Sequence, residues 1–281
     1  MAWAWSGQGW CGGGRVSLCG VNDYRHVTVR IDGWVAELVL DRPEAHNALS
    51  TAMAHEIGDA TAMLAQDHSV RVVVVSSSSE KAFCVGADLK ERNSFSDHDL
   101  AAQRPVFRAA FGGVLDLPMP AIAAVHGFAL GGGLEFALSC DLIVCDETAV
   151  LGLPEVTVGV IPGGGGTQLL TRRVGSARAA DLVFTGRRVA VDEAQALGLV
   201  DRRVAAGQDR AAAFELAATI AANSPVGVRN AKRALRAGWG LDLPAGLEVE
   251  DGCWRATAIS GDRHEGISAF NEKRRPDWPG K

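Results

Sequence analysis

The sequence is organised around Ala129-Leu-Gly-Gly-Gly-Leu-Glu-Phe-Ala-Leu-Ser-Cys-Asp141, where three consecutive glycines lead into an apolar run that carries one carboxylate. The run from Glu135 to Ser139 predicts a helix with the glycines at its N-terminus. Glycine lets a ligand approach the backbone, and the unpaired N–H groups of a helix N-terminus suit an oxygen that becomes negative during a reaction. Tight helix packing, with Glu135 as an ordinary acid of the first turn, explains the same residues.

The composition is that of a soluble globular protein. The chain has 281 residues, of which 47% are apolar, and this is enough for one large core or two small ones. The net charge of -5, from 28 Lys and Arg against 33 Asp and Glu, argues against a nucleic-acid surface. No uncharged run approaches the length needed to span a membrane. We therefore expect small-molecule partners, with no nucleic acid and no membrane.

The cysteines and histidines do not predict a metal site. The six cysteines lack paired spacing and the seven histidines lack short ligand spacing. Cysteines inside apolar runs indicate buried free thiols, which fit a reducing, cytoplasmic setting. The glycine runs also lack the Gly-Lys-Ser/Thr of a P-loop and a dinucleotide fingerprint directly after a strand. We expect no metal and no nucleoside-triphosphate chemistry.

Residues 1–23 are rich in glycine and tryptophan, and Arg15 is their only basic residue. They lack the basic segment and the uninterrupted apolar segment of a signal peptide. We interpret them as a loose N-terminal extension, and a partner surface there stays open.

The pattern then becomes regular. His26 to Ile31 and Val35 to Leu40 alternate around Asp32-Gly33, which predicts a hairpin. A helix capped by Ser50 follows, and the continuous run Val70 to Val75 predicts a strand buried on both faces.

A similar order recurs in the middle of the chain, with strands at Ala121 to Val125 and Leu142 to Cys145 around the helix Gly131 to Ser139. Repeated strand-strand-helix units with helical crossovers predict an α/β fold with stacked parallel sheets. After Val204 only helices are predicted, at Asp209 to Ala222, Val226 to Ala237, Pro244 to Ile259 and Asp262 to Lys273. This separate helical layer docks either on a neighbouring subunit or on its own chain.

Two stretches on either side of the central helix carry further candidates. Lys81-Ala-Phe-Cys-Val-Gly-Ala-Asp-Leu-Lys-Glu91 contains Gly86-Ala87, which can turn an N–H inward; a plain turn with Asp88 as a helix cap is the alternative. On the other side, Glu155 follows a proline, as acids of a first helical turn often do.

With a further stretch near the N-terminus, four motifs occur in order along the chain. They are Arg42-Pro-Glu-Ala-His-Asn-Ala-Leu49, Phe83-Cys-Val-Gly-Ala-Asp-Leu-Lys90, Ala129-Leu-Gly-Gly-Gly-Leu-Glu135, and Pro154-Glu155 with Ile161-Pro-Gly-Gly-Gly-Gly-Thr-Gln168. Together they resemble the enoyl-CoA hydratase/isomerase (crotonase) family, from Tyr24 to the C-terminal Phe270-Asn-Glu-Lys273. The resemblance implies a crotonase-like spiral of ββα units in residues 24–204 and a C-terminal helical trimerisation region in residues 205–281.

The resemblance also implies an acyl-CoA thioester substrate, with no separate cofactor because CoA is part of the substrate. The oxyanion hole of the family falls on the backbone N–H groups of Ala87 and Gly132, which would stabilise the enolate oxygen of the thioester. A homotrimer or a dimer of trimers is implied as the assembly. The CoA contacts fall on Ala45, Ala87 and Lys90 and, from an adjacent subunit, on Phe270 and Lys273.

Hydratases of the family keep two glutamates, which fall here on Glu135 and Glu155. The resemblance assigns Glu135 mainly to activating water for attack on C3 and Glu155 mainly to the C2 proton. Members that only shift a double bond work with one acid at the Glu155 position, so the pair favours an enoyl-CoA hydratase over an isomerase. A crotonase-fold binding protein without activity is the other alternative, and it has no need of two buried carboxylates.

Within the family, the sequence looks most similar to methylglutaconyl-CoA hydratase/AU-binding homologues, from Gly86-Ala-Asp-Leu-Lys-Glu-Arg92 and Ala269-Phe-Asn-Glu-Lys-Arg-Arg275. Those homologues bind RNA through a lysine-rich early helix, whereas Ser50 to Asp67 has no Lys or Arg here, so RNA binding is not expected. Two residues depart from the family pattern. Glu44 replaces a basic residue that contacts CoA in some members, and Val85 replaces the usual small residue before Gly86.

Overall fold

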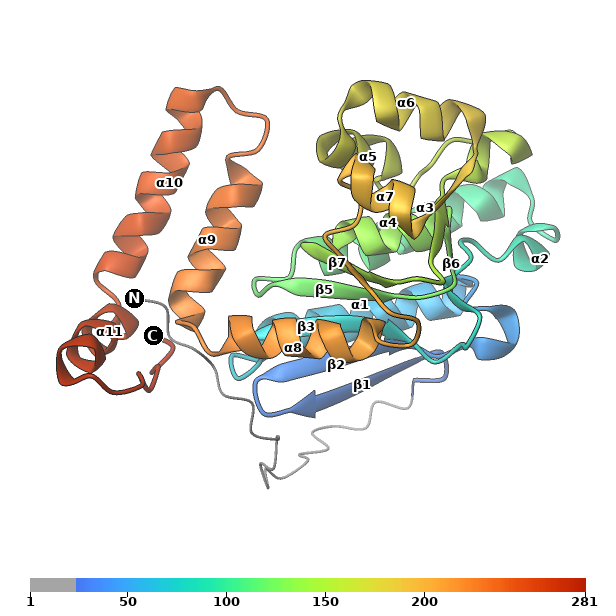
Figure 1. Cartoon of the computed structure of the whole chain (residues 1–281). Coiled ribbons are helices and arrows are strands. Elements are labelled where there is room, and N and C mark those ends of the chain that lie inside the picture. The colour runs from blue at the N-terminus through green and yellow to red at the C-terminus, as the bar shows by residue number, and fades with distance from the viewer. Residues whose placement is uncertain (1–23) are drawn as a thin grey trace.

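Two sheets form the centre of the protein (Figure 1). The computed structural model describes residues 24–281, and the predicted extension at residues 1–23 lies outside the described residues. The larger sheet has the order β1-β2-β3-β5-β7-β10, formed by Val27–Asp32, Val35–Leu40, Val72–Ser77, Ala121–Val125, Leu142–Asp146 and Arg202–Val204. The smaller sheet has the order β4-β6-β8-β9, formed by Ala82–Cys84, Phe128–Leu130, Val150–Gly152 and Arg188–Ala190.

Most neighbouring strands pair in parallel, as helical crossovers require. Among the described strands only β1–β2 and β8–β9 are antiparallel. The first of these pairs is the predicted hairpin, in which Asp32 lies opposite Val35 across the turn. The prediction of an α/β fold with parallel sheets is confirmed.

The central strands of the six-stranded sheet, β3, β5 and β7, are buried on both faces. Successive side chains of a strand point to opposite sides, so each of these strands contributes to a core on either face. Val73 and Val75 of β3 belong to the main core with α1 (Thr51–Gln66), α3 (Asp97–Leu115) and α4 (Gly132–Ser139). Val72 and Val74 pack instead with residues of α8 (Asp209–Ala221). The predicted start of α1 is confirmed, since the Ser50 side chain accepts a hydrogen bond from the Met53 N–H at 3.2 Å.

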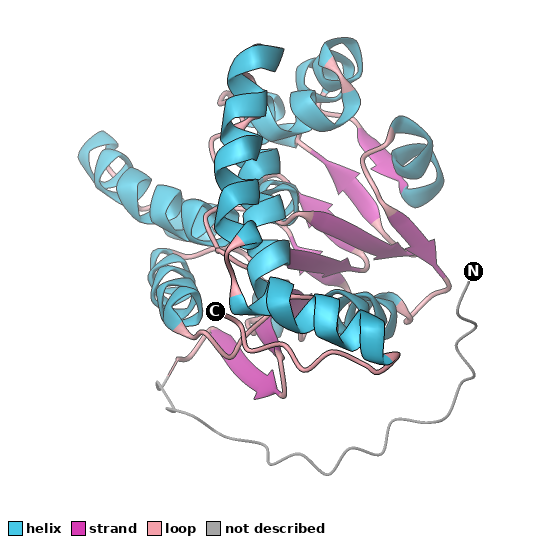
Figure 2. Cartoon of the chain, turned by 90° about the vertical axis from the view of Figure 1, so that its left-hand side faces the viewer, coloured by secondary structure: helices cyan, strands magenta, loops and turns pink. Residues whose placement is uncertain are grey.

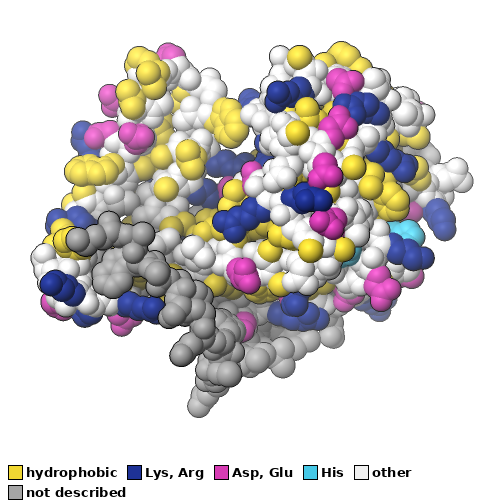
Figure 3. Space-filling view, in the orientation of Figure 1, with side chains coloured by type: hydrophobic (Ala, Val, Ile, Leu, Met, Phe, Trp, Pro, Cys, Tyr) yellow, Lys and Arg dark blue, Asp and Glu magenta, His cyan; other side chains and the backbone are white. Residues whose placement is uncertain are grey.

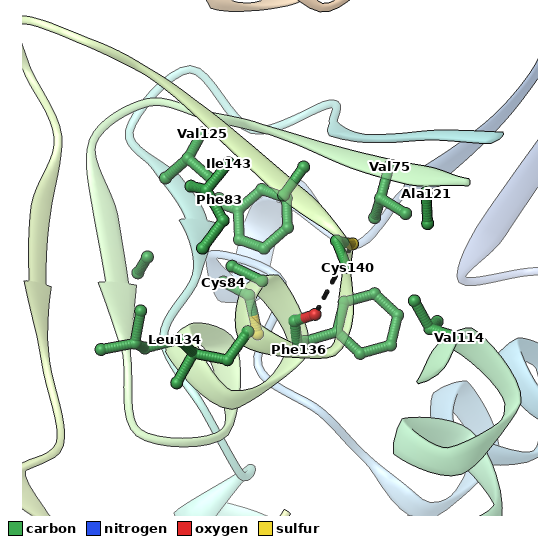
Figure 4. Close-up of a cluster of buried hydrophobic side chains, with 14 of the residues drawn as sticks. Val75, Phe83, Cys84, Val114, Ala121, Val125, Leu134, Phe136, Cys140 and Ile143 are labelled. Carbon is green, nitrogen blue, oxygen red and sulfur yellow. Dashed lines mark hydrogen bonds between the residues drawn. The ribbon is translucent and has the colours of Figure 1, made fainter. Parts of the chain in front are cut away.

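Helix α4 is buried along its whole length. Figure 4 shows Leu134 and Phe136 of this helix in one apolar cluster with Phe83 of β4 and Ile143 of β7. Elements of both sheets therefore surround α4. Its N-terminus is held in a fixed place relative to the strand ends.

Four helices follow β10, as predicted: α8, α9 (Pro225–Ala237), α10 (Leu243–Ala258) and α11 (Gly261–Glu272). These helices were predicted to form one separate layer, but α8 does not belong to such a layer. Its residues Ala213, Leu216 and Ala217 pack on the large sheet. The main contacts of α10 are with α9 and α11, and the α9–α10 pair stands to one side of the sheets (Figures 1 and 2). Ion pairs from Lys232 and Arg236 to Asp141, at 2.8 and 2.9 Å, link α9 to the core.

The remaining helical segments lie between the strands: η1 (Pro43–Ala45), α2 (Leu89–Arg92), η2 (Pro154–Val158), α5 (Gly166–Val174), α6 (Ser176–Thr185) and α7 (Val191–Leu197). In residues 24–281, no single helix is long and apolar enough to cross a bilayer. Helices α8 and α9 meet that criterion only as a pair, across a bend of 108°.

Candidate active site

The site is built around the N-terminus of α4, directly after β6. Gly131 is the N-cap, with φ 52° and ψ -127°, a backbone conformation that a residue with a Cβ adopts only under strain. As the first residue of the helix, Gly132 has an N–H with no intrahelical acceptor. This N–H also has no backbone acceptor elsewhere in residues 24–281.

The second candidate donor, the Ala87 N–H, is oriented by a β-bridge to Leu49. The Leu49 N–H donates to the Gly86 carbonyl at 2.8 Å, and the Asp88 N–H donates to the Leu49 carbonyl at 2.9 Å. In this pattern the N–H of the middle residue, Ala87, points away from Leu49. Its hydrogen has no backbone acceptor among the described residues.

The two donors lie beside each other because Gly86 allows close approach. Gly86 has φ 92°, and a Cβ on it would lie 2.9 Å from the Leu130 carbonyl oxygen and 3.1 Å from the Gly132 nitrogen. The loop that carries Ala87 therefore packs backbone to backbone on the start of α4. Two neighbouring free N–H groups are the arrangement that stabilises a carbonyl oxygen as it becomes negative.

Asp88 is the helix cap that the alternative interpretation describes, and it has a second partner that the sequence did not indicate. Its side chain accepts from the N–H groups of Lys90 and Glu91. It also accepts from Arg42 Nη1 at 2.6 Å, while the same Nη1 donates to the Ala48 carbonyl at 2.9 Å. Arg42 thus links the first motif to the loop that carries Ala87. The only sequence signal for this role was its place in that motif.

Glu135 lies in the first turn of α4 with only 3% of its surface exposed. Its Oε1 accepts hydrogen bonds from the N–H groups of Gly164 and Gly166, at 2.6 and 2.8 Å. Burial raises the pKa of this carboxyl, and the backbone donors of the second glycine run oppose that rise. The glycine run therefore holds a buried carboxylate in one orientation.

Glu155 lies in η2, and its carboxyl group has a different environment. Both oxygens are buried without a hydrogen-bond partner among the described residues. Oε1 lies 3.1 Å from the position that a Cβ on Gly131 would occupy, which places the carboxyl at the N-terminus of α4. Burial raises the pKa of Glu155 to about 7, and the negative charge of Glu135 adds to the rise. Such a group can both give and take a proton near neutral pH.

The structure thus brings Glu135, Glu155, Ala87 and Gly132 together around one helix N-terminus. Ala45 is half-buried in η1, and Lys90 is exposed on α2, next to the Asp88 cap. Phe270 and Lys273, at the end of α11, are exposed and are not brought to this site within one chain, since α11 has its main contacts with α9 and α10. In the described part of the chain, His, Cys, Asp and Glu side chains form no group of three that could hold a metal ion.

The sequence profile of one protein family, described as enoyl-CoA hydratase/isomerase, matches residues 30–281. The chain belongs to the enoyl-CoA hydratase/isomerase family. It is 42% identical over 254 residues to the Homo sapiens enoyl-CoA hydratase domain-containing protein 2, mitochondrial, covering 89% of this chain and 87% of that protein. It is 38% identical over 261 residues to the Rattus norvegicus methylglutaconyl-CoA hydratase, mitochondrial, covering 92% of this chain and 82% of that protein.

A solved structure supports the family assignment. The crystal structure of an enoyl-CoA hydratase from Bacillus anthracis matches with a TM-score of 0.89 and 39% identity, covering 92% of this chain and all of that chain. The predicted crotonase fold is therefore confirmed. All of the candidate site residues lie inside the part of the chain that matches the enoyl-CoA hydratase/isomerase family.

Proposed function

We propose that the protein is an enoyl-CoA hydratase, a hydro-lyase that adds water across the 2,3 double bond of an enoyl-CoA thioester to give a 3-hydroxyacyl-CoA. The observation that carries the proposal is the contrast between its two buried carboxyl groups. Backbone N–H groups hold Glu135, whereas Glu155 has no hydrogen-bond partner in residues 24–281 and a pKa of about 7. Hydration needs one group that takes a proton from water and another that gives a proton to C2.

In this mechanism Glu135, in its ionised form, takes a proton from water while the water oxygen forms a bond to C3. The π electrons move toward the thioester, whose carbonyl oxygen becomes an enolate oxygen bound by the Ala87 and Gly132 N–H groups. Glu155, in its protonated form, then gives its proton to C2, and exchange with solvent restores both carboxyl groups. Removing one donor of such an oxyanion hole typically costs about 3 to 4 kcal/mol of transition-state stabilisation.

The CoA moiety is proposed to bind at the mouth of this site, along Ala45, Ala87 and Lys90. Lys90 is the cation nearest to Ala87 in sequence and is free to meet a phosphate, since its side chain is exposed. Phe270 and Lys273 are proposed to complete the nucleotide end from an adjacent subunit. Glu44 stands in η1 beside Ala45 with its side chain 73% exposed and does not supply a cation there.

The assembly proposed for this site is a homotrimer or a dimer of trimers. Figure 3 shows apolar side chains along the exposed side of the C-terminal helices, to one side of the sheets. The exposed fractions are 51% for Leu247, 65% for Trp254, 83% for Ile259 and 84% for Phe270. Exposed apolar side chains in such numbers mark a protein interface.

A cytoplasmic location and the absence of RNA binding stay predictions. The four described cysteines are free and buried, which fits a reducing compartment. Helix α1 has no Lys or Arg and carries Glu56 and Asp59. A helix of this composition offers no basic surface to a phosphate backbone.

The proposal is tested with a panel of 2-enoyl-CoA and 3-enoyl-CoA thioesters of different acyl groups. We expect loss of the conjugated-thioester absorbance with 2-enoyl-CoA and formation of the 3-hydroxyacyl-CoA, identified by mass. Double-bond migration in 3-enoyl-CoA without any water addition would favour the isomerase. Tight acyl-CoA binding without turnover of either class would favour the binding protein.

A further inference from the structure

Two guanidinium groups lie next to the proposed site and have no role in the mechanism above. They belong to Arg104 on α3 and to Arg92 at the end of α2. In residues 24–281, neither forms an ion pair with a carboxylate. Arg92 is half-buried and Arg104 is exposed, so both guanidinium groups can meet a ligand that enters from solvent.

Arg104 lies over the glycine run that holds Glu135. Its Nη1 is 2.9 Å from the position that a Cβ on Gly163 would occupy, so the guanidinium rests on this backbone. The neighbouring Gly164 N–H donates to Glu135 Oε1. The positive charge of Arg104 is close enough to lower the pKa of Glu135, against the larger effect of burial.

Arg92 reaches the same region from α2. Its Nε donates to Gln103 Oε1 at 2.9 Å, and its Cζ lies 5.0 Å from the centre of the Phe107 ring. Burial lowers the pKa of this guanidinium, and the charges of Glu91 and Glu135 act against that shift. The oxygens of Glu91 accept from the Thr51 N–H and from the Gln103 side chain. The two terminal nitrogens of Arg92 have no hydrogen-bond partner among the described residues.

The apolar wall between these groups and the oxyanion hole is formed by α3. The Phe111 ring lies 3.5 Å from the position of a Cβ on Gly132 and 2.6 Å from that of a Cβ on Gly164. Phe107, one turn earlier, contacts Phe111 with ring centres 6.3 Å apart and lies under Arg92. An acyl chain that followed this wall from the oxyanion hole would end beside the two guanidinium groups, since Arg92 lies over Phe107 and Arg104 over Gly163.

We infer that Arg92 and Arg104 bind an anionic group at the distal end of the acyl chain, so that the favoured substrates are enoyl-CoA thioesters whose acyl group ends in a carboxylate. The inference rests on the proposed function for the position of the thioester. Guanidinium groups bind carboxylates through paired, charge-assisted hydrogen bonds. One relative is named an enoyl-CoA hydratase domain-containing protein and another a methylglutaconyl-CoA hydratase, so the names of the relatives do not decide the acyl group.

The alternative is that the two arginines only keep Glu135 ionised. In that case, substitution of the arginines changes the turnover of every substrate by the same factor. The wild type and the variants then bind acyl-CoA thioesters with and without a distal carboxylate equally well. The two cases are separated by binding measurements on saturated thioesters, which need no turnover. They can therefore be decided even if the protein hydrates nothing.

The experiment measures dissociation constants by calorimetry for glutaryl-CoA and for 5-methylhexanoyl-CoA, in which an isopropyl group replaces the distal carboxylate at nearly equal size. The wild type, Arg104→Gln, Arg104→Lys and Arg92→Gln are compared with Arg108→Gln. Arg108 is exposed on the same helix as Arg104 and is not among the groups that act on Glu135. We expect the wild type to bind glutaryl-CoA about 10 to 100-fold more tightly than the isostere. Arg104→Gln and Arg92→Gln should remove most of this preference, Arg104→Lys should keep part of it, and Arg108→Gln should keep all of it.

Equal affinity of the wild type for the two thioesters would overturn the inference, as would a preference that survives in both Arg104→Gln and Arg92→Gln. If 2-enoyl-CoA hydration fails while the charge preference is present, the proposed function is wrong and the anion site stands. If hydration is present without the charge preference, the anion site is wrong and the proposed function stands.

Discussion

Glu135 and Glu155 meet at one helix N-terminus in opposite states of hydrogen bonding. Glu135 Oε1 accepts from two backbone N–H groups, whereas both oxygens of Glu155 are buried without a partner among the described residues. The negative charge of Glu135 also contributes to the raised pKa of Glu155. The same fold therefore favours a carboxylate at one position and a carboxylic acid at the other, as the two proposed roles require.

The first prediction concerns the pH dependence of hydration. In the proposed mechanism Glu155 is protonated to supply the C2 proton, so kcat/KM for hydration should fall as the pH rises through about 7, the pKa of Glu155. Glu135 must be ionised, so the rate should also fall on the acid side, at a pH above the usual range of a glutamate because its pKa is raised. Initial rates from about pH 5 to about pH 9 give both limbs. If kcat/KM of the wild type did not fall on the alkaline side, the proposed role of Glu155 would be contradicted.

The second prediction concerns the packing of α4 on β4. A Cβ on Gly133 would lie 2.0 Å from the Cys84 carbonyl oxygen, so Gly133→Ala forces backbone apart in the core. We expect a loss of about 1 to 3 kcal/mol in the free energy of unfolding. Gly58→Ala is the matched control, because a Cβ there meets nothing within 4 Å and Gly58 lies inside α1. It should raise stability by about 0.5 to 1 kcal/mol in urea unfolding. Equal stability of the two variants would contradict this account of α4.

The third prediction concerns His126, which joins the end of the large sheet to the start of α8. Its Nδ1 lies 3.0 Å from Asp209 Oδ2 and its Nε2 lies 2.6 Å from the Ser79 carbonyl oxygen. The hydrogen bond with Asp209 raises the pKa of His126, and the Ser79 carbonyl adds to the rise. The stabilisation is therefore complete below about pH 6.5, the pKa of an unfolded histidine, and is lost as the pH rises through the folded pKa.

Urea unfolding of the wild type, measured from below about pH 6.5 to above the folded pKa of His126, should show the free energy of unfolding decrease as the pH rises. His126→Gln, Asp209→Asn and the double variant should each lack the same pH-dependent component, because it belongs to the pair. If the same pH dependence of the free energy of unfolding remained in His126→Gln, it would come from another group and the prediction would be wrong.

The fourth prediction concerns the proposed assembly. Trp254→Glu places a charge on the exposed side of α10 and should shift sedimentation from the proposed trimer toward smaller species. Activity should be lost as well, because the proposed CoA site includes Phe270 and Lys273 of an adjacent subunit. Leu100→Glu, at an exposed position of α3, should sediment like the wild type. A fully active wild-type monomer would contradict both the assembly and the proposed roles of Phe270 and Lys273.

The sequence was most informative where one local pattern determines the structure. The continuous apolar run of β5 and the spacing of the C-terminal helices needed no tertiary information. Helix α3 was not predicted, and Pro105 inside it is a residue that usually ends a helix. The position of α8 on the large sheet depends on packing between residues far apart in the chain.

The candidate acids could be named from their motifs, but their different environments could not. The pKa of Glu155 depends on burial against Gly131, which precedes it by more than twenty positions. The contact between Arg42 and Asp88 joins residues 46 positions apart, and the position of Arg104 over Gly163 joins α3 to a distant loop. Contacts of this kind are set by the fold and leave no periodic signal in the sequence.

The most direct test of the account measures hydration of a 2-enoyl-CoA by the wild type, Glu135→Gln, Glu155→Gln and the double variant, with acyl-CoA affinity measured in parallel. Each single variant should lose about 10² to 10⁴-fold in kcat while keeping its affinity, since each removes one proton-transfer group. The double variant should be little worse than the poorer single variant, because the two groups serve the same transition state. Near wild-type hydration by both single variants, with the fold intact, would contradict the assignment of Glu135 and Glu155.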